Sequence, residues 1–525
     1  MSRILYTFIT LLFTLETIAE ISVIPAPLSI KETPNEYRSG DKIEICYNPL
    51  LKSEAEYLQS IFTKEGLQCS LTTGTKRKNN IVLELSSEIK GKEAYSLETS
   101  SQTIHISASS PTGIFYGIQT LRQLIRIDNR QIIVPGISIQ DRPAFPWRAF
   151  MLDECRHFKG KECVKQLLDE MAFLKMNTFH WHLTDDQGWR IEIKKYPLLT
   201  SVGAFRDSTQ LENSRSNKYL QEPHGGFYTQ EEIKEIIRYA DRLHIRIIPE
   251  IEMPGHAGAA IAAYSWLGCT GKQIPVPCKF GVNYDILDVT NPEVYSFIED
   301  VLDEIINLFP SPIIHIGGDE VKYNHWKASP AITQYMEKNK IKNPAELQID
   351  FTNKISRMLS QKGKRMIGWN DITGDKIHNF QAEDETGSSA QLAPGTIVQF
   401  WKGDSTLIRK TLEKGFDIVN SYHIYTYLDY TYKKTPLEKA YSFSPIPENI
   451  PVEHKKHILG LGCQMWTEWL PTCESAQKMI FPRIAAHAET GWTAPENKDF
   501  TRFSDALQKL LIHWDKVGIK YGDFK

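Results

Sequence analysis

The spacing of apolar positions changes part-way along the chain. Between about residues 21 and 140, short runs alternate apolar and polar side chains, as strands with one buried face do. Ile114, Ile118, Leu121 and Ile125 recur at helical spacing in the same part. The strand-like runs cover residues 42–46, 81–85, 95–98, 103–108 and 132–139. This part of the chain therefore predicts a small α+β domain.

Residues 141–146 (DRPAFP) contain two prolines and interrupt the pattern, which marks a domain boundary. Beyond them, strand-like runs alternate with helical patterns, as parallel βα units do. Thr229 with Glu232 predicts a capping box, and Asn291 before Pro292 predicts a helix start. Eight strands are expected, at residues 148–152, 178–183, 246–251, 313–316, 365–369, 397–401, 417–420 and 459–465.

Eight strands with their helices over about 350 residues favour a (β/α)8 TIM barrel over a doubly wound sheet. The expected fold class is thus α/β, a barrel catalytic domain preceded by a small α+β domain. We expect residues 20–140 to form the small domain and residues 141–525 to form the barrel.

Composition and charge narrow the possible partners. The 525 residues are 41% hydrophobic and 11% aromatic, which is typical of a globular protein, and the net charge is −3. Such a charge creates no field that would gather nucleic acid or anionic lipid. We therefore expect no nucleic-acid partner and no membrane insertion, whereas the oligomeric state is left open.

The first residues predict export. Arg3 precedes an apolar run from Ile4 to Leu15, which is too short to span a bilayer and is followed by small residues ending at Ala19. This pattern predicts a signal peptide over residues 1–19. No Asn-x-Ser/Thr acceptor occurs, which favours a bacterial protein of the periplasm or the extracellular space.

The eight cysteines form four pairs that are local in sequence. They are Cys46/Cys69, Cys155/Cys163, Cys269/Cys278 and Cys463/Cys473. An oxidising compartment would allow some of them to form disulfides, although one sequence does not give the connectivity. Because Cys269 and Cys278 bracket a loop rich in proline and glycine, we expect a disulfide there.

Polar and aromatic side chains follow every predicted barrel strand. The carboxyl ends of barrel strands form the active face, so these side chains should meet at one pole. One acid or tryptophan at a strand end usually packs or caps, but contributions from all eight strands predict a site. The residues are Asp153, Arg156, Asp185, Asp186, Trp189, Glu250, Glu252, His256, Asp319, Glu320, Trp369, Trp401, Tyr427, Asp429, Trp466 and Glu468.

The chemistry of these side chains points to carbohydrate. Asp319 and Glu320 follow two glycines, which allow a tight turn and close ligand approach. Burial and mutual repulsion can keep one of two adjacent acids protonated while the other stays ionised. Three tryptophans, Trp369, Trp401 and Trp466, can enclose a sugar ring. Arg156, Asp429 and Glu468 can bind its hydroxyls.

Adjacency of the two acids restricts the mechanism. A retaining glycosidase with two enzymic carboxylates places them about 5–5.5 Å apart on opposite faces of the sugar. Consecutive residues at one strand end do not suit that arrangement. Glu320 is therefore expected to be the acid, while Asp319 orients a nucleophile that belongs to the substrate, such as a 2-acetamido oxygen.

Six segments of the barrel resemble glycoside hydrolase family 20, the β-N-acetylhexosaminidases. They are residues 152–158 (LDECRHF), 180–187 (HWHLTDDQ), 249–256 (PEIEMPGH), 315–320 (HIGGDE), 427–429 (YLD) and 465–468 (MWTE). Residues 113–124 (GIFYGIQTLRQL) are similar to the N-terminal domain of that family. The resemblance implies an exo-acting, retaining enzyme that removes terminal GlcNAc or GalNAc from glycans, with no metal and no cofactor.

The resemblance also implies a role for each matching residue. Glu320 would protonate the glycosidic oxygen and later activate water, and Asp319 would orient the acetamide as an oxazolinium forms. Asp185 and His256 would support Glu320 as a dyad, and Tyr427 would hydrogen-bond the acetamide oxygen beside Asp429. Arg156 and Glu468 would bind the sugar hydroxyls. Trp369, Trp401 and Trp466 would wall the acetamide pocket and form the floor beneath the sugar.

Three positions depart from the family pattern. Glu252 stands where Asp is frequent, so a longer side chain must fit, and Cys155 stands where serine is common. No tryptophan follows Asp429 before Pro451, which leaves Tyr441 as the candidate aromatic on the leaving-group side.

Two other functions fit parts of the pattern. A barrel of this kind could bind glycans without cleaving them, although the retained Asp319 and Glu320 argue against that. His180 and His182 share one strand face, as metal ligands of amidohydrolase barrels do. A structural role behind the site suits these two histidines better, because they lie on the second strand.

Overall fold

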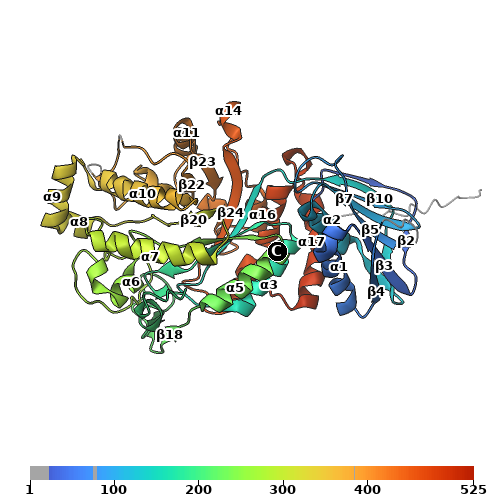
Figure 1. Ribbon diagram of the computed structural model, residues 1–525, viewed down its shortest axis with the longest axis horizontal. Helices are drawn as coiled ribbons and strands as arrows, with labels where there is room; N and C mark the ends of the chain where they lie inside the picture. Colours follow the sequence, from blue (N-terminus) through green and yellow to red (C-terminus); the bar gives the residue numbers. More distant parts are fainter. Residues whose placement is uncertain (1–22, 75–79, 383–384, 389, 525) are drawn as a thin grey trace, which may run out of the picture.

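A computed structural model describes residues 23–74, 80–382, 385–388 and 390–524. The predicted signal peptide, residues 1–19, lies outside this range. The chain forms a small α+β part and a larger barrel that lie side by side along the long axis of the molecule (Figure 1).

The larger part is a closed barrel of eight parallel strands, which confirms the predicted TIM barrel. Each strand begins and ends within one or two residues of its predicted position, because near-continuous apolar runs mark strands buried on both faces. The strands are β11 (Trp147–Asp153), β12 (Thr178–His182), β19 (Arg246–Glu250), β20 (Ile313–His315), β21 (Arg365–Trp369), β22 (Ile397–Phe400), β23 (Asp417–Asn420) and β24 (Ile458–Met465).

Helices surround the barrel, and two of them, α5 and α7, begin at the predicted caps. Thr229 forms a capping box with Glu232 at the start of α5, and the Asn291 side chain accepts the Glu293 backbone N–H ahead of Pro292 in α7. The main outer helices are α3 (Lys161–Phe173), α5 (Gln230–Arg242), α7 (Pro292–Leu308), α10 (Pro344–Gln361), α11 (Ser405–Glu413), α15 (Cys473–Ile480) and α16 (Arg483–Trp492).

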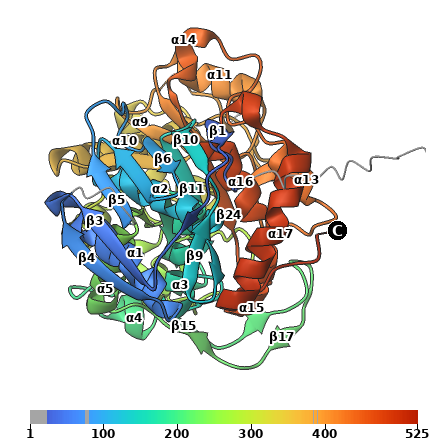
Figure 2. The ribbon, with the colours of Figure 1, turned by 90° about the vertical axis from the view of Figure 1, so that its right-hand side faces the viewer.

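The small part contains a mixed seven-stranded sheet in the order β1-β10-β6-β7-β5-β3-β4, with α1 (Lys52–Lys64) and α2 (Pro111–Leu124) packed on it (Figure 2). Its strands are β1 (Ser29–Glu32), β3 (Lys42–Tyr47), β4 (Gln68–Thr73), β5 (Asn80–Leu85), β6 (Tyr95–Thr99), β7 (Thr103–Ala108) and β10 (Ile137–Asp141). A separate three-stranded sheet joins β2 (Tyr37–Arg38), β9 (Gln131–Val134) and β8 (Arg126–Asp128).

The prediction of a single strand over residues 132–139 is wrong. It is two strands, β9 and β10, which belong to different sheets. Pro135 between them has no backbone N–H for a ladder. Gly136 lies so close to the loop between β1 and β2 that a Cβ would stand 1.7 Å from the Asn35 carbonyl oxygen, so only glycine fits at this bend.

Buried ion pairs join the two parts. Lys175 Nζ lies 3.0 Å from Asp141 Oδ2, and the Trp492 indole donates to the same oxygen at 2.9 Å. Arg148 pairs with Glu93 at 2.9 Å. The last helix, α17 (Phe500–Val517), lies between the small sheet and the barrel (Figure 1). The interface is therefore built from the first domain, the barrel and the C-terminal helix together.

The expected disulfide between Cys269 and Cys278 is absent among the described residues, and both are free thiols. The Cys269 thiol faces the carbonyl oxygens of Ile286 and Leu287 instead. The disulfide joins Cys163 to Cys473, 310 residues apart. Because β11 pairs with β24 as the barrel closes, α3 and α15 become neighbours, which sequence locality cannot show.

Candidate active site

A strained turn presents Asp319 and Glu320 at the end of β20. Gly317 and Gly318 have φ of +64° and +88°, and Glu320 itself has φ of +52°. A Cβ on Gly317 would stand 1.8 Å from Glu252 Oε2, so only glycine fits there. The Gly317 backbone N–H donates to His315 Nδ1 at 2.9 Å, which fixes the turn from below.

The two acids occupy different surroundings. Asp319 is 8% exposed, and its Oδ1 has no hydrogen-bond partner among the described side chains and backbone. Burial raises its pKa to about 7 against the attraction of His256, and the charges of Asp371 and Glu320 add to the rise. The Glu320 side chain is 24% exposed and therefore faces the opening of the barrel. The structure thus raises the pKa of Asp319, whereas the sequence argument reserved the protonated state for the acid catalyst.

Two histidines lie on either side of the Glu320 carboxyl group. His256 Nε2 is 3.7 Å from Oε2, and His378 Nδ1 is 3.8 Å from Oε1. Each histidine is backed by an aspartate: His256 Nδ1 lies 3.2 Å from Asp185 Oδ1, and His378 Nε2 lies 2.6 Å from Asp371 Oδ1. The structure thus brings Asp185 and His256 together with Glu320, as expected, and adds a second pair.

That second pair was missed by the sequence analysis. Asp371 also accepts the Glu320 backbone N–H at 3.0 Å and the Trp401 indole N–H at 2.8 Å. Burial opposes the charged form of His378, but the hydrogen bond to Asp371 and the charges of Asp371 and Glu320 together outweigh it and raise the His378 pKa. The only signal for the pair was the position of Asp371, two residues beyond the end of β21.

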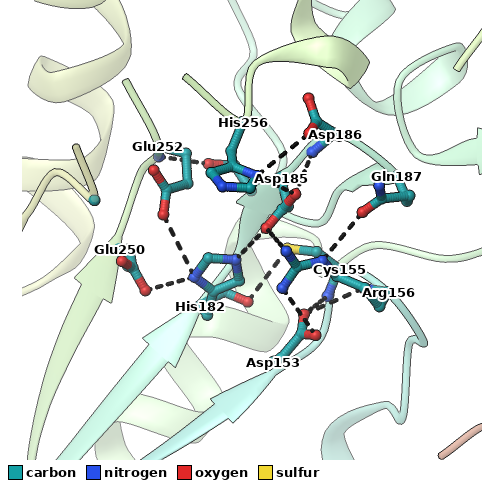
Figure 3. Close-up of polar contacts among 12 residues, drawn as sticks. Asp153, Cys155, Arg156, His182, Asp185, Asp186, Gln187, Glu250, Glu252 and His256 are labelled. Carbon is teal, nitrogen blue, oxygen red and sulfur yellow. Dashed lines mark hydrogen bonds and ion pairs between the residues drawn. The ribbon is translucent and has the colours of Figure 1, made fainter. Parts of the chain in front are cut away.

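Arg156 lies at the centre of a buried polar cluster (Figure 3). Its Nη2 is 2.8 Å from Asp185 Oδ2, its Nη1 is 3.3 Å from Asp153 Oδ2, and its Nε donates to Gln187 at 3.1 Å. Burial acts against the charge of Arg156, but the acids outweigh it and raise its pKa further. The guanidinium is therefore a fixed cation, and it lies 5.0 Å from the centre of the Trp466 ring.

Glu468 and Asp429 lie on the same side of the site. Burial raises the pKa of Asp429 to about 8, helped by the charge of Glu468, and it raises the pKa of Glu468 against the attraction of Arg156. Asp429 Oδ1 has no hydrogen-bond partner among the described residues. Two buried carboxyl oxygens, on Asp319 and Asp429, therefore lack donors, and hydroxyl and amide groups of a ligand would supply them.

Four aromatic rings form a continuous wall. Trp369, Trp466, Tyr427 and Trp401 follow one another with neighbouring centroids 6.0 Å apart, and Trp401 stacks on Tyr427 at an interplanar angle of 7°. Trp369 is 1% exposed and donates to Glu250, so it acts mainly as a support behind Trp466. Trp369, Trp401, Tyr427 and Trp466 thus meet at one pole, as predicted. The prediction for Trp189 is wrong, because its ring packs on Phe297 of α7 and its indole donates to the Ile191 carbonyl oxygen. Tyr441 does not join the wall either, because it packs on Phe503 and its hydroxyl donates to Glu489.

Below the acids lies a layer of buried charge. Glu250 contacts His180 at 2.9 Å. It also contacts His182, whose other nitrogen lies 2.8 Å from Asp185 (Figure 3). Burial opposes ionisation of Glu250, but the neighbouring histidines outweigh it and hold its pKa well below the ordinary range. His182, Glu250 and Glu252 offer ligand atoms within 4.8 Å of one another, the spacing of a metal site.

His182 lies between two carboxylates. Its Nδ1 contacts Glu250 Oε2, and its Nε2 lies 2.8 Å from Asp185 Oδ2. Burial lowers the His182 pKa, but Glu250 and Asp185 outweigh it and raise the pKa to about 10. Hydrogen bonds from both ring nitrogens to carboxylates suit a positioning role for this histidine.

The two departures near the acids have structural explanations. The longer Glu252 side chain occupies the space left by Gly317, and Gly318 N–H points to its Oε2 at 3.4 Å. Burial and the charges of Asp319 and Glu250 raise the Glu252 pKa well above its ordinary value. Cys155 is fully buried, and its thiol points to the His182 carbonyl oxygen at 3.4 Å. Both residues are thus part of the layer that supports the site.

Comparison with known proteins agrees with this geometry. The profile "Glycosyl hydrolase family 20, catalytic domain" matches residues 145–495, and "Glycosyl hydrolase family 20, domain 2" matches residues 20–142. A β-hexosaminidase of Porphyromonas gingivalis is 36% identical over 95% of this chain, and one of Vibrio furnissii is 38% identical over 76% of it. The chain spans 64% and 65% of the lengths of these two relatives.

A solved structure extends the comparison to three dimensions. A family 20 exo-β-N-acetylglucosaminidase of Vibrio harveyi, solved with N-acetylglucosamine, is 31% identical and superimposes with a TM-score of 0.82. The match covers 95% of this chain and 78% of that one. Since the catalytic-domain profile alone spans more than half of the sequence, this chain belongs to glycoside hydrolase family 20.

Proposed function

We propose that the protein is an exo-acting, retaining β-N-acetylhexosaminidase that releases terminal GlcNAc or GalNAc from glycans. The main observation is the contrast between its two adjacent acids. Glu320 lies between two histidines and faces the opening, whereas Asp319 is buried beside it with one oxygen unpaired among the described residues. One acid is placed to exchange protons, and the other to hold a polar group of the substrate.

In the proposed reaction, Asp319 and Tyr427 hold the substrate acetamide so that its oxygen attacks the anomeric carbon. The glycosidic C–O bond breaks, and the leaving oxygen takes the proton from Glu320. Water then attacks the anomeric carbon of the oxazolinium, the bond between that carbon and the acetamide oxygen breaks and restores the acetamide, and Glu320 takes the proton that the water loses. The histidine–aspartate pairs hold the carboxyl group in place through both steps.

The remaining site residues fit the sugar. Arg156, Glu468 and Asp429 would bind its hydroxyls, and Trp466 and Trp401 would contact the ring and the acetamide methyl group. Trp369 supports Trp466 from behind. The substrate class is therefore a glycan with a terminal N-acetylhexosamine.

Product analysis tests this proposal. A p-nitrophenyl β-GlcNAc glycoside and a defined chitobiose should both release GlcNAc, and NMR should detect the β-anomer first. Replacing the N-acetyl group of the substrate by hydroxyl should abolish cleavage. Equal cleavage of that analogue, or release of the α-anomer, would contradict the proposal. Activity lost to a chelator and restored by zinc would point to the amidohydrolase instead.

We further propose that the protein is exported. The N-terminal pattern supports this, and so does the Cys163–Cys473 disulfide, which persists in oxidising compartments. In the described part of the chain, no helix is both long and apolar enough to cross a bilayer. Immunoblotting of periplasmic and culture fractions, with N-terminal sequencing of the mature chain, tests cleavage after Ala19.

A further inference from the structure

The exposed side chain of Phe380 packs on His378, the histidine that lies beside Glu320. Phe380 is 43% exposed and stacks on His378, with centroids 4.8 Å apart and an interplanar angle of 17°. His378 in turn lies 3.8 Å from Glu320. Phe380 therefore lies just outside the point where the glycosidic oxygen must meet Glu320, and none of the roles above uses it.

A lysine and a second aromatic ring continue this surface. Lys322, two residues after Glu320, places Nζ 4.2 Å from the centre of the Tyr284 ring and 5.7 Å from that of Phe380. Tyr284 is 50% exposed. The ammonium donates one hydrogen bond, to the Val282 carbonyl oxygen at 3.0 Å, and retains two further donors. We call Tyr284, Lys322 and Phe380 the mouth cluster.

Two ammonium groups of this region have no carboxylate partner. Lys402 Nζ lies 3.2 Å from Nδ1 of His378, the ring on which Phe380 stacks. Among the described residues, neither Lys322 nor Lys402 forms an ion pair with a carboxylate. Two acids of the same region do have partners: Asp371 is hydrogen-bonded to His378, and Asp285 lies 3.7 Å from His325.

We infer that the mouth cluster is the leaving-group subsite and that it selects leaving groups bearing a carboxylate or a sulfate. This inference rests on the proposed function. Because Glu320 must touch the glycosidic oxygen, the leaving group starts at Glu320 and extends across the side chains packed outside it. Phe380 and Tyr284 offer ring faces for stacking, and Lys322 offers a cation to an anionic substituent.

An exposed tryptophan, Trp469, directly follows Glu468 in the chain. Trp469 is 40% exposed and packs on Phe280 at 5.1 Å, next to Glu468. It therefore adjoins the residues proposed to bind the sugar hydroxyls and provides a comparison position for the experiment.

The experiment compares two substrates that differ in charge but not in size: 4-carboxyphenyl and 4-carbamoylphenyl β-GlcNAc. GlcNAc release is measured for the full chain and for Lys322→Gln. We expect the variant to lose about fivefold in kcat/KM on the carboxylate, the scale of a partly exposed ion pair, and less than twofold on the amide. The difference should shrink in 0.5 M NaCl. Lys322→Arg should restore the preference.

Three further variants refine the test. Phe380→Ala and Tyr284→Ala should raise KM for both substrates, because they remove stacking. Lys272→Gln, an exposed lysine of the loop that also carries Tyr284, should leave the ratio of the two substrates unchanged, which controls for overall charge. Melting temperatures are expected to stay within a few degrees of the unmodified chain.

The outcomes separate the two proposals. If the unmodified chain cleaves neither glycoside, the proposed function fails. If it cleaves both, and Lys322→Gln lowers both rates equally or neither, the anionic subsite is refuted while the function stands. If Trp469→Ala changes the ratio and Lys322→Gln does not, the leaving group contacts Trp469 instead, and the inference is wrong.

Discussion

Oε1 of Glu320 lies 3.8 Å from Nδ1 of His378, on the side of the carboxyl group opposite His256. The general acid thus lies between two imidazoles, although the family resemblance implied a role only for His256. This arrangement lets a positive charge on either ring favour the carboxylate that forms when Glu320 gives up its proton.

Loss of the second imidazole should change the pH dependence of the reaction. His378→Asn removes the ring next to Oε1, whose own pKa is raised by the hydrogen bond to Asp371 and by the charges of Asp371 and Glu320. We expect the kcat profile to lose the limb that follows ionisation of His378, with kcat at neutral pH reduced about tenfold or more. Steady-state kinetics from pH 4 to 9 measure this. An unchanged profile with only KM raised would mean that His378 merely packs against the site.

Replacing the general acid should abolish most turnover. Glu320→Gln removes the proton donor but keeps the shape, so kcat on natural linkages should fall by about 10²–10⁴. Aryl glycosides with good leaving groups should suffer less, because they need little protonation. Circular dichroism and melting temperature control for folding. Full activity on chitobiose would contradict the assigned role.

Asp319 should make stability depend on pH. Its folded-state pKa is raised to about 7, so between roughly pH 4 and 7 the folded protein holds a proton that the unfolded chain has lost. Its contribution to stability is present below the unfolded-state pKa and is lost as the pH rises through about 7. Asp319→Asn should therefore match the unmodified chain near pH 4 and exceed its stability above pH 7.

The size of that gain should be on the order of a few kcal/mol, measured by urea unfolding at several pH values. Activity should be lost at every pH. Asp207→Asn, which alters an exposed side chain, serves as the control and should show no such trend. If the two variants behave alike, the burial of Asp319 does not cost the protein stability.

Gly317 and Gly363 form a matched pair. Both have positive φ, +64° and +72°, but only at Gly317 would a Cβ collide with a neighbour, the Glu252 carboxyl group. Gly363→Ala should cost about 1 kcal/mol from backbone strain alone. Gly317→Ala should cost at least about 3 kcal/mol more or prevent folding, because the collision adds to the strain. Equal melting temperatures would show that Glu252 can move away.

The disulfide should stabilise the fold without affecting catalysis. Cys163→Ser with Cys473→Ser removes a bond that closes a loop of 310 residues, so the free energy of unfolding should fall by about 2–5 kcal/mol. The bond joins α3 to α15 on the outside of the barrel, so kcat should stay within twofold. Cys278→Ser, which alters a free thiol, is the control. A drop in kcat matching the drop in stability would contradict this separation.

Local signals were enough to predict much of the barrel. Its strands are short apolar runs at regular intervals, and helix caps such as Thr229 with Glu232 follow from neighbouring residues. The site could be predicted for the same reason, since residues next to a strand end, such as Glu320 after β20, share the pole of that strand. Contacts that form only when the first and last barrel strands pair could not be predicted, and the Cys163–Cys473 disulfide is the clearest case.

Other failures also have physical causes. His378 lies nine residues beyond β21, in a loop whose path is set by its hydrogen bond to Asp371, and no periodic pattern marks it. Helix α1 was not predicted, because its buried face has only three apolar positions, Ala55, Leu58 and Phe62, and its fourth buried residue is the acidic Glu54. Tyr441 was predicted at the leaving-group side only because no tryptophan follows Asp429 before Pro451, and its side chain lies in the hydrophobic core instead.

The position of α17 has a consequence for how this protein can be cut or recombined. Arg502 of that helix binds both Glu489 of the barrel and the Val23 carbonyl oxygen, and Glu489 also accepts the Ala26 backbone N–H. Removing the first domain would remove the Ala26 donor from the Glu489 carboxylate and expose a face of α17. Gene fusions and truncated variants should therefore keep all residues from Val23 to the end of α17 together.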